Sequence, residues 1–236
     1  MVRIMLRALL FDVQGTATDF HSTVCAEARR IGGARYRHID WPGFVDHWRA
    51  EYFAALRKAK PDRDNWVTVH SVYANTLDGL LGDYGIDLSP DRRADLTLAW
   101  QRLEPWPDVV TGLNRLASKF TIATLSNADV AAVVNMSKRA GLPWDAVFTA
   151  EMAGAFKPDP TVYRMAARYL GLEPSEIMMV ASHKYDIQAA GALGFRTAFV
   201  ARPLEFGKGG DVDVSFDDDF DINATDFLDL ADQLDC

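Results

Sequence analysis

Four short polar segments of the sequence contain residue types that could do chemistry. Each segment follows, or lies just beyond, a stretch that is typical of a buried strand. Together they supply two aspartates that could serve as nucleophile and base, a lysine that could neutralise one of them, and several hydroxyl groups. The segments are Phe11-Asp12-Val13-Gln14-Gly15-Thr16, Leu125-Ser126-Asn127, Phe156-Lys157-Pro158-Asp159-Pro160 and Val180-Ala181-Ser182-His183-Lys184-Tyr185-Asp186.

Each segment also has an ordinary structural explanation. An aspartate before a glycine-threonine turn, such as Asp12, is often a turn residue, and Ser126 could simply cap a helix. Lys157 could be a solvated loop lysine, and Asp186 could be an exposed acid favoured by a helix dipole. We favour chemistry because the four segments recur in this order at the strand ends of one predicted sheet.

The elements around these segments alternate between strand and helix. After an apolar run near residues 4–11, the sequence predicts strands at 120–125, 146–148, 177–180 and 196–200, separated by helices at 129–140, 160–170 and 185–193. Such alternation indicates a parallel, doubly wound sheet with helices on both faces. Open sheets of this class bind ligands beyond the carboxyl ends of their strands, where the four segments would lie.

Between about residues 20 and 105 the pattern changes, because three helical patterns follow one another with no convincing strand between them. They run near residues 42–60, 66–84 and 89–103. The tail after Phe206 is rich in glycine and aspartate and predicts a strand-like or loop segment and a short terminal helix. We therefore expect an α/β fold with a Rossmann-like doubly wound core of residues 1–18 and 107–236. An all-helical cap of residues 19–106 would interrupt it over the active-site edge.

The composition narrows the class of protein. The chain has 236 residues and a formal net charge of -8, which argues against nucleic-acid binding because that needs basic clusters. Cys25 and Cys236 form neither a disulfide framework nor a zinc-ligand pattern. The N-terminal apolar run contains an arginine and is typical of a strand rather than a signal peptide. No apolar stretch approaches membrane-spanning length, so we expect a soluble cytoplasmic protein.

In order and composition, the four segments resemble the motifs of the haloacid dehalogenase (HAD) superfamily, and more narrowly those of the L-2-haloacid dehalogenases. The helical insertion resembles the cap of that family, so the resemblance covers nearly the whole chain except the acidic tail. It implies a HAD-like hydrolase in which Asp12 is the nucleophile and Thr16 orients it, with Lys157 and Asp186 beside them. A homodimer is also expected from the resemblance.

Two positions distinguish this chain from the phosphatases of the same superfamily. Those enzymes resemble one another in carrying a second aspartate, two residues after the nucleophile, that protonates the leaving alkoxide. Here that position is Gln14, which cannot donate such a proton. They also hold Mg²⁺ with an acid at the position that is Ser182 here, and Lys184 adds positive charge nearby. Halide leaves without a proton, and a haloacid with one negative charge needs no metal. We therefore predict no metal and no cofactor.

The predicted reaction is the hydrolytic dehalogenation of a short 2-haloacid. The Asp12 carboxylate would attack the α-carbon opposite the halogen and form an ester, while Lys157 keeps Asp12 ionised. Ser126 and N–H groups at the following helix start would bind the substrate carboxylate. Water would then attack the ester carbonyl with Asp186 as base or water-positioning group. One inversion would convert an (S)-2-haloacid into an (R)-2-hydroxyacid and halide.

The halide needs its own binding site, for which the family uses an arginine of the first cap helix and the asparagine after the motif-two serine. Arg49 and Asn127 match these positions. Arg49 could instead be a surface arginine paired with Asp46 or Glu51, a pairing worth little stability.

The remaining pocket residues depart from the family pattern. We expect Gln14, Ser182 and His183 to contribute to the substrate pocket. Gln14 replaces an aromatic residue that many of these dehalogenases carry, and Ala181 and His183 stand where many have serine and asparagine. His183 could be a loop histidine with a satisfied hydrogen bond, or a pocket donor near the water or the departing halide. Aromatic residues of the cap would mostly build its core, and a few would wall the pocket.

Three alternative functions stay open at this point. They are a phosphatase on the same fold, a hydrolase that opens a strained ring such as azetidine-2-carboxylate, and a non-catalytic protein that acts by interaction. The combination of Asp12, Lys157 and Asp186 argues against the last, because a binding module has no use for two facing carboxylates and a lysine. The expected partners are a small 2-haloacid anion and halide, with no nucleic acid and no membrane.

Overall fold

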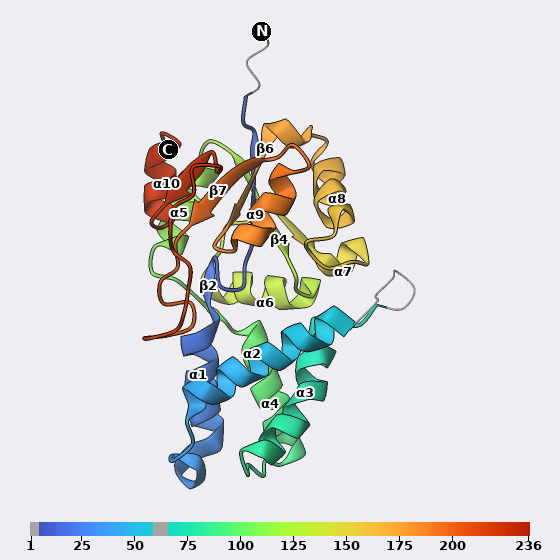
Figure 1. Ribbon diagram of the computed structural model, residues 1–236, viewed down its shortest axis with the longest axis vertical. Coiled ribbons are helices and arrows are strands. Elements are labelled where there is room, and N and C mark those ends of the chain that lie inside the picture. Colours follow the sequence, from blue (N-terminus) through green and yellow to red (C-terminus); the bar gives the residue numbers. More distant parts are fainter. Residues whose placement is uncertain (1–4, 59–65) are drawn as a thin grey trace.

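The computed structural model describes residues 5–58 and 66–236, which form a sheet-containing half and a helical half (Figure 1). The sheet contains six strands in the order β5-β4-β1-β6-β7-β8, and every neighbouring pair is parallel. This topology confirms the predicted doubly wound α/β core. The strands are β1 Ala8–Phe11, β4 Thr121–Ser126, β5 Ala146–Thr149, β6 Ile177–Ala181, β7 Arg196–Val200 and β8 Ile222–Ala224.

Helices cover both faces of the sheet. Apolar residues of α5 and α10 pack on one face, and apolar residues of α8 and α9 pack on the other. The helices of this half are α5 Val109–Ala117, α6 Val130–Ala140, α7 Ala150–Ala153, α8 Pro160–Leu170, α9 Lys184–Gly191 and α10 Phe227–Gln233, with a short 3-10 turn at Pro174–Glu176.

The central strand β1 shows why both faces must be covered. Ala8 and Leu10 pack into the cluster beneath α8 and α9, whereas Leu9 and Phe11 pack into the cluster beneath α5 and α10. Successive side chains of a strand point to opposite faces, so a strand that is apolar at every position needs two covers. Burying each leucine or phenylalanine contributes about 1.5–3 kcal/mol, which fixes the strand that carries the first polar segment at its end.

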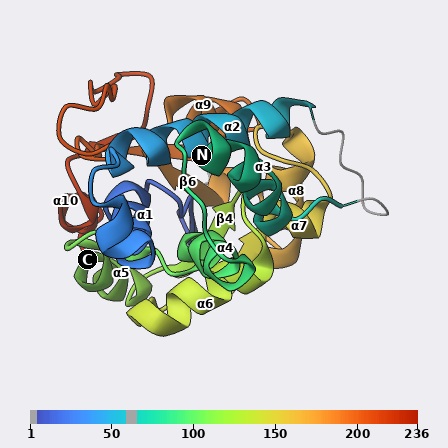
Figure 2. The same ribbon diagram turned by 90° about the horizontal axis from the view of Figure 1, so that it is seen from below.

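The helical half lies beyond the carboxyl ends of the strands (Figure 1). Seen from below, its helices lie in front of the sheet and cover that edge (Figure 2). The predicted insertion of an all-helical cap is therefore confirmed. Its helices are α1 Phe20–Gly32, α2 Trp41–Lys58, α3 Val69–Asp83 and α4 Pro90–Thr97, with 3-10 turns at Gly33–Tyr36 and Leu98–Gln101.

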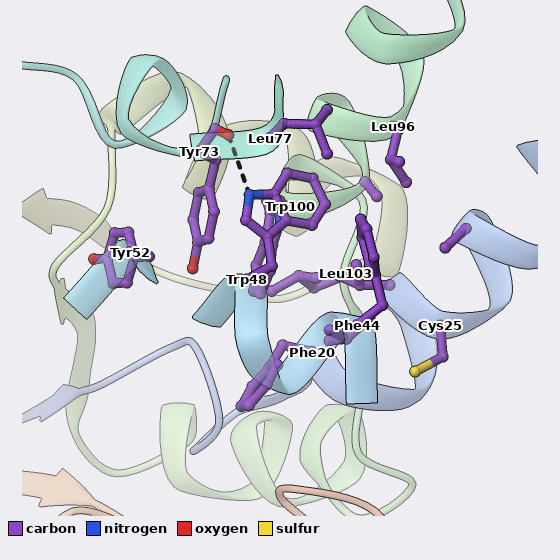
Figure 3. Close-up of a cluster of buried hydrophobic side chains, with 14 of the residues drawn as sticks. Phe20, Cys25, Phe44, Trp48, Tyr52, Tyr73, Leu77, Leu96, Trp100 and Leu103 are labelled. Atoms are coloured by element: carbon purple, nitrogen blue, oxygen red, sulfur yellow. Dashed lines mark hydrogen bonds between the residues drawn. The ribbon is translucent and has the colours of Figure 1, made fainter. Parts of the chain in front are cut away.

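Aromatic side chains form the centre of the cap (Figure 3). The ring of Tyr73 on α3 stacks between Trp100 and Tyr52, with ring centroids 4.0 Å and 4.5 Å away. Trp48 of α2 donates a hydrogen bond from Nε1 to the backbone carbonyl of Tyr73 over 3.1 Å. These stacked and hydrogen-bonded rings join α2, α3 and the turn after α4 into one packed body.

Two short strands join the halves. β2 (Thr18–Asp19) pairs antiparallel with β3 (Glu104–Pro105), so the chain enters and leaves the helical half at neighbouring points. Helix α6 also contacts the cap, because its buried residues Ala132, Val133 and Met136 belong to the cap cluster. We propose that the cap has the bounds expected from the sequence, residues 19–106, which this paired ribbon brackets.

Some elements differ from the sequence predictions. Helices α1, α5 and α7 were not predicted, and the helix expected to reach residue 103 ends at Thr97 and continues as a 3-10 turn. The remaining core helices and strands lie within a few residues of their predicted bounds, and β8 and α10 confirm the expected tail. Residue 4 of the first predicted strand, and residues 59 and 60 of the first predicted cap helix, lie outside the described residues.

Within residues 5–58 and 66–236, no helix combines the length and the apolar character that crossing a membrane would require. The cytoplasmic location stays a prediction.

Candidate active site

The four polar segments converge where the strands end. Asp12 follows the last residue of β1, Ser126 is the last residue of β4, and His183 lies two residues beyond β6. Lys157 reaches the same place from the loop between α7 and α8, and Asp186 lies in the first turn of α9. The topology therefore brings together residues that are more than a hundred positions apart in the sequence.

The carboxylate of Asp12 is held from both sides. Its Oδ1 lies 3.0 Å from the Lys157 ammonium and accepts a hydrogen bond from Ser126 Oγ over 3.2 Å. Its Oδ2 accepts a hydrogen bond from Thr16 Oγ1 over 3.0 Å and lies 3.4 Å from His183 Nδ1. Burial by itself would raise the pKa of Asp12, but Lys157 first and His183 next hold this pKa well below its usual range. Asp12 is therefore ionised at neutral pH, as a carboxylate nucleophile would have to be.

Lys157 bridges two buried carboxylates. Its ammonium also contacts Asp186 Oδ2, and Asp186 Oδ1 accepts a hydrogen bond from the Tyr163 hydroxyl over 2.5 Å. Asp12, Lys157 and Asp186 are only 5%, 6% and 1% exposed. Burial would lower the pKa of Lys157, but the two aspartates raise it above its usual range, so the lysine is charged. Burial raises the pKa of Asp186, and Lys157 offsets only part of this effect.

Thr16 is oriented by Ser182. The backbone N–H of Ser182 donates to Thr16 Oγ1 over 2.9 Å, and the two hydroxyl oxygens lie 3.0 Å apart. Thr16 has one hydroxyl hydrogen, so accepting from Ser182 leaves that hydrogen directed at Asp12. Ser182 was expected in the substrate pocket, and the structure places it against Thr16, on the side of Oδ2.

A small cavity of about 20 Å³ lies in front of Asp12. Both halves of the molecule contribute to its wall. The residues that line it are Asp12, Gln14, Arg49, Tyr52, Phe53, Ser126, Asn127, Lys157, His183 and Tyr185. Phe53, Asn127, Lys157 and Tyr185 also line a larger neighbouring hollow, which opens toward the end of α2.

Arg49 is buried and directed at the core. Its guanidinium donates to Gln14 Oε1 over 2.9 Å and to the Tyr73 hydroxyl, and it lies over the ring of Phe53 at 4.6 Å from the centroid. The alternative of a surface arginine paired with Asp46 or Glu51 is therefore wrong. Among the described residues, the buried Arg49 Nε has no hydrogen-bond partner. This unused donor on a cavity-lining cation suits an anion.

Asn127 braces the lysine loop. Its Oδ1 accepts from the Lys157 backbone N–H over 2.7 Å, and its Nδ2 donates to the Lys157 carbonyl over 3.1 Å. One amide hydrogen of Nδ2 lies outside this pair of bonds. Asn127 also lines the cavity, so its expected contact with halide stays a prediction.

His183 has a partner that the sequence reasoning missed. Its Nε2 lies 2.8 Å from Oε1 of Glu205, which comes from the loop after β7 and is 2% exposed. Burial would lower the pKa of His183, but Glu205 and then Asp12 raise it well above its usual value. The other missed residue is Tyr163 on α8, which holds Asp186.

The expectation that Lys184 adds charge near the site is wrong. Its ammonium instead bonds to Asp213 Oδ2 over 2.7 Å and to Ser215, both in the acidic tail. The cation between the two buried carboxylates is Lys157. Within the described part of the chain, no group of three or more metal-ligating side chains is assembled.

Comparison with known proteins places this geometry in a family. The sequence profile of the haloacid dehalogenase-like hydrolases matches residues 6–194. The chain is 31% identical over 209 residues to (S)-2-haloacid dehalogenase 1 of Pseudomonas sp. (strain CBS-3), covering 84% of this chain and 85% of the relative. A solved L-2-haloacid dehalogenase is similar with 38% identity and a TM-score of 0.88, over 97% of this chain and 99% of that one.

A second solved structure shows a related enzyme with its substrate attached. It is the L-2-haloacid dehalogenase of Xanthobacter autotrophicus with chloropropionic acid covalently bound, at 26% identity and a TM-score of 0.79, covering 98% of this chain and 99% of that one. The profile spans most of the sequence, and the solved relatives share the fold. The chain belongs to the haloacid dehalogenase-like hydrolases.

Proposed function

We propose that this hydrolase removes halide from short (S)-2-haloalkanoic acids and forms the (R)-2-hydroxyacid. The observation that carries the proposal is the setting of Asp12, an ionised carboxylate whose segment lacks the second aspartate with which a phosphatase protonates its leaving group. The position two residues on is Gln14, and its Oε1 is bonded to Arg49. Halide leaves as a weak base and needs no proton, whereas an alkoxide leaving group does.

The first step is displacement at the α-carbon. A lone pair of Asp12 Oδ1 forms the new carbon–oxygen bond, and the carbon–halogen pair leaves with the halide. Ser126 and Lys157 lie beside Oδ1, and we assign them to the substrate carboxylate and to the charge of the nucleophile. We assign Arg49 Nε and the remaining amide hydrogen of Asn127 to the halide, since both residues line the cavity. The Xanthobacter relative with its covalently bound acid supports an ester of this kind.

The second step is hydrolysis of the ester. Water attacks Cγ of Asp12, and Asp186 accepts or directs a water proton. Collapse of the tetrahedral intermediate breaks the bond from Cγ to the substrate oxygen and restores a carboxylate on Asp12. The α-carbon is inverted once, in the first step, so an (S) substrate gives an (R) product. Each turnover consumes one water and releases one proton with the halide.

Enclosure favours the displacement step. The cavity in front of Asp12 is small and bounded by Tyr52, Phe53 and Tyr185, so bulk water is kept from the nucleophile. We also propose that the partners of the protein are small anions, the haloacid and halide, and that it forms the homodimer expected from the resemblance.

The test is halide release by the purified protein from (S)-2-chloropropionate, chloroacetate and fluoroacetate in the presence of EDTA. We expect halide release with the metal chelated. If none of the three substrates releases halide and a phosphate ester is hydrolysed on addition of Mg²⁺, the phosphatase alternative would replace the proposal. Consumption of azetidine-2-carboxylate without halide release from any haloacid would favour the ring-opening alternative.

A further inference from the structure

The buried carboxylate of Glu205 lies behind His183 and outside all four polar segments. Glu205 contacts His183 Nε2, and the opposite ring nitrogen, Nδ1, faces Oδ2 of Asp12. The three side chains thus form a line from the loop after β7 to the nucleophile. Aspartate and glutamate are rarely this buried unless they are paired, so the placement of Glu205 calls for a reason.

The loop that carries Glu205 is firmly anchored. The backbone N–H of Glu205 donates to the carbonyl of Arg202 over 3.0 Å. Arg202 in turn donates from Nε to the carbonyl of Thr16 over 2.7 Å. The two terminal nitrogens of Arg202 bind both oxygens of Asp108 at 2.8 Å each. A two-point bond of this kind fixes orientation as well as distance. The Glu205 carboxylate is therefore preorganised beside His183.

The turn after the nucleophile makes room for the same carboxylate. Gly15 has φ +94, which side chains other than glycine rarely adopt, and a Cβ at this position would collide with Oε1 of Glu205. That Cβ would also lie 3.3 Å from Cε1 of His183. Gly15 thus permits the close approach of Glu205 and His183 to the segment that carries Asp12.

The charges around His183 favour its protonated form. Asp12 and Glu205 face its two ring nitrogens, and the ring of Tyr185 stacks on it with centroids 5.8 Å apart. Lys157 and Arg49 line the same cavity and oppose protonation, but neither contacts the imidazole as the two carboxylates do. The net effect is a pKa of His183 well above its usual value, with Glu205 as the larger favourable contribution.

We propose that Glu205 is a positioning residue that keeps His183 as an imidazolium, so that Nδ1–H donates to Asp12 Oδ2 during ester hydrolysis. The proposal rests on the proposed function, in which Oδ1 forms the ester and Oδ2 becomes the ester carbonyl oxygen. When water attacks Cγ, the π pair of the carbonyl moves to Oδ2, which then carries the negative charge. Thr16 already donates to this atom, and the charged Nδ1 of His183 lies 3.4 Å from it, close enough to donate as the charge develops.

Two groups handle the protons of ester hydrolysis differently, His183 by holding one and Asp186 by transferring one. His183 stays protonated throughout and only strengthens its hydrogen bond as charge develops on Oδ2, so it transfers no proton. One water proton goes to Asp186, which returns it to the alkoxide leaving from Cγ, so that the hydroxyacid is released. The second water proton leaves Asp12 as its carboxylate re-forms. Charge-assisted donors are about twice as strong as neutral ones, so losing the charge of His183 weakens the second step selectively.

The test compares the wild-type enzyme with Glu205→Gln, which keeps the shape of the side chain and removes its charge. Rapid quenching with (S)-2-chloropropionate follows halide in the first turnover and the intact mass of the esterified protein. At pH 8 we expect a first-turnover halide rate close to wild type and ester hydrolysis slower by on the order of 10- to 100-fold, so the ester accumulates. At pH 6 the deficit should shrink, because solvent then protonates His183.

Two further variants and one direct measurement complete the test. Asp213→Asn removes one exposed charge from the acidic tail that follows this loop and should leave both steps unchanged. His183→Asn should slow hydrolysis without recovery at pH 6, since it has no group to reprotonate. An NMR titration of the free enzyme should show His183 protonated past neutral pH in the wild type, and titrating at lower pH in Glu205→Gln.

The outcomes separate this proposal from the proposed function. Normal titration of His183 in the wild-type enzyme, or the same slowing of both chemical steps at both pH values in Glu205→Gln, would overturn the role of Glu205. A wild-type enzyme that releases no halide would overturn the proposed function, and the titration would then still decide whether Glu205 holds His183 protonated.

Discussion

Arg49 of the cap donates a hydrogen bond to Gln14 of the core over 2.9 Å, two residues beyond the nucleophile. Gln14 stands where the phosphatases of the superfamily carry an acid, and here it binds the guanidinium of a cap residue. Gln14 holds the guanidinium beside Asp12, and the guanidinium keeps Gln14 from swinging into the cavity. This pair links the cap directly to the segment that carries Asp12.

This pair gives the first prediction. Arg49→Lys keeps a positive charge but removes Nε and the planar fork, so halide is no longer met by a fixed donor. We expect kcat/KM for (S)-2-chloropropionate to fall by about 10- to 100-fold, as for loss of one charge-assisted donor. The control is Arg92→Lys on the exposed side of α4, which should be neutral. An unchanged rate in Arg49→Lys would remove Arg49 from the site.

The nucleophile gives the second prediction. Asp12→Asn retains the shape of the side chain but removes the attacking charge, and we expect turnover to fall by at least about 10⁴-fold with the fold intact. Circular dichroism and thermal unfolding serve as the check on folding. A folded variant that still turns over at a tenth of the wild-type rate would rule out Asp12 as the attacking group.

Isotope labelling tests the covalent route in the wild-type enzyme. In a single turnover in oxygen-18 water, hydrolysis at Cγ should place the label in Asp12, while the product hydroxyl carries an oxygen from the unlabelled carboxylate. Mass analysis of the Asp12 peptide and of the hydroxyacid measures both. Label found first in the product would mean that water attacks the α-carbon directly.

Stability should depend strongly on Lys157. Lys157→Met leaves Asp12 and Asp186 as two buried carboxylates without their shared cation, and we expect a loss of about 3–5 kcal/mol in the free energy of unfolding. The lowered pKa of Asp12 means that, in the wild type, its contribution to stability is present above its unfolded value and is lost as pH falls through its folded value. The variant lacks this contribution, so its deficit in urea unfolding should be larger at neutral pH than in acid. A deficit that does not vary with pH would contradict this account.

The rates of the two chemical steps should depend differently on pH, because the pKa values of Asp12 and Asp186 are shifted in opposite directions. Burial raises the pKa of Asp186, so its base form is lost as pH falls through a value above the usual aspartate range. Asp12 stays ionised there because its own pKa is lowered. We expect the first-turnover halide rate to persist while steady-state turnover declines with acid. A parallel decline of both rates would assign the acid limb to another group.

The site residues that the sheet itself positions could be predicted from the sequence. Asp12 follows β1, Ser126 ends β4 and Asp186 lies in the helix after β6, and the parallel order of those strands brings them together. Lys157 was identified by resemblance, and the structure confirms its place against both aspartates. Convergence of this kind follows from strand patterns, which local sequence reveals well.

Residues placed by packing were harder to find. Glu205 lies in a loop without strand or helix periodicity, and its only signal is an acid between the apolar Leu204 and Phe206. Tyr163 is one of several apolar positions of α8, so its hydroxyl contact with Asp186 depends on where α9 packs. Helix α1 was visible in principle, since its buried residues Phe20, Val24, Ala28 and Ile31 recur at helical spacing.

The pairing of β2 with β3 has an evolutionary consequence. Because the chain leaves the sheet and returns to it at adjacent residues, the whole insertion is equivalent, for the sheet, to a short turn. The entropy of closing such a loop grows only slowly with its length, so the insertion can lengthen, shrink or be exchanged without displacing β1. The core thus keeps Asp12 and its own part of the pocket wall, while the rest of that wall is carried on a stretch that can change by itself. New substrates can be acquired by remodelling the insertion while Asp12 stays where it is.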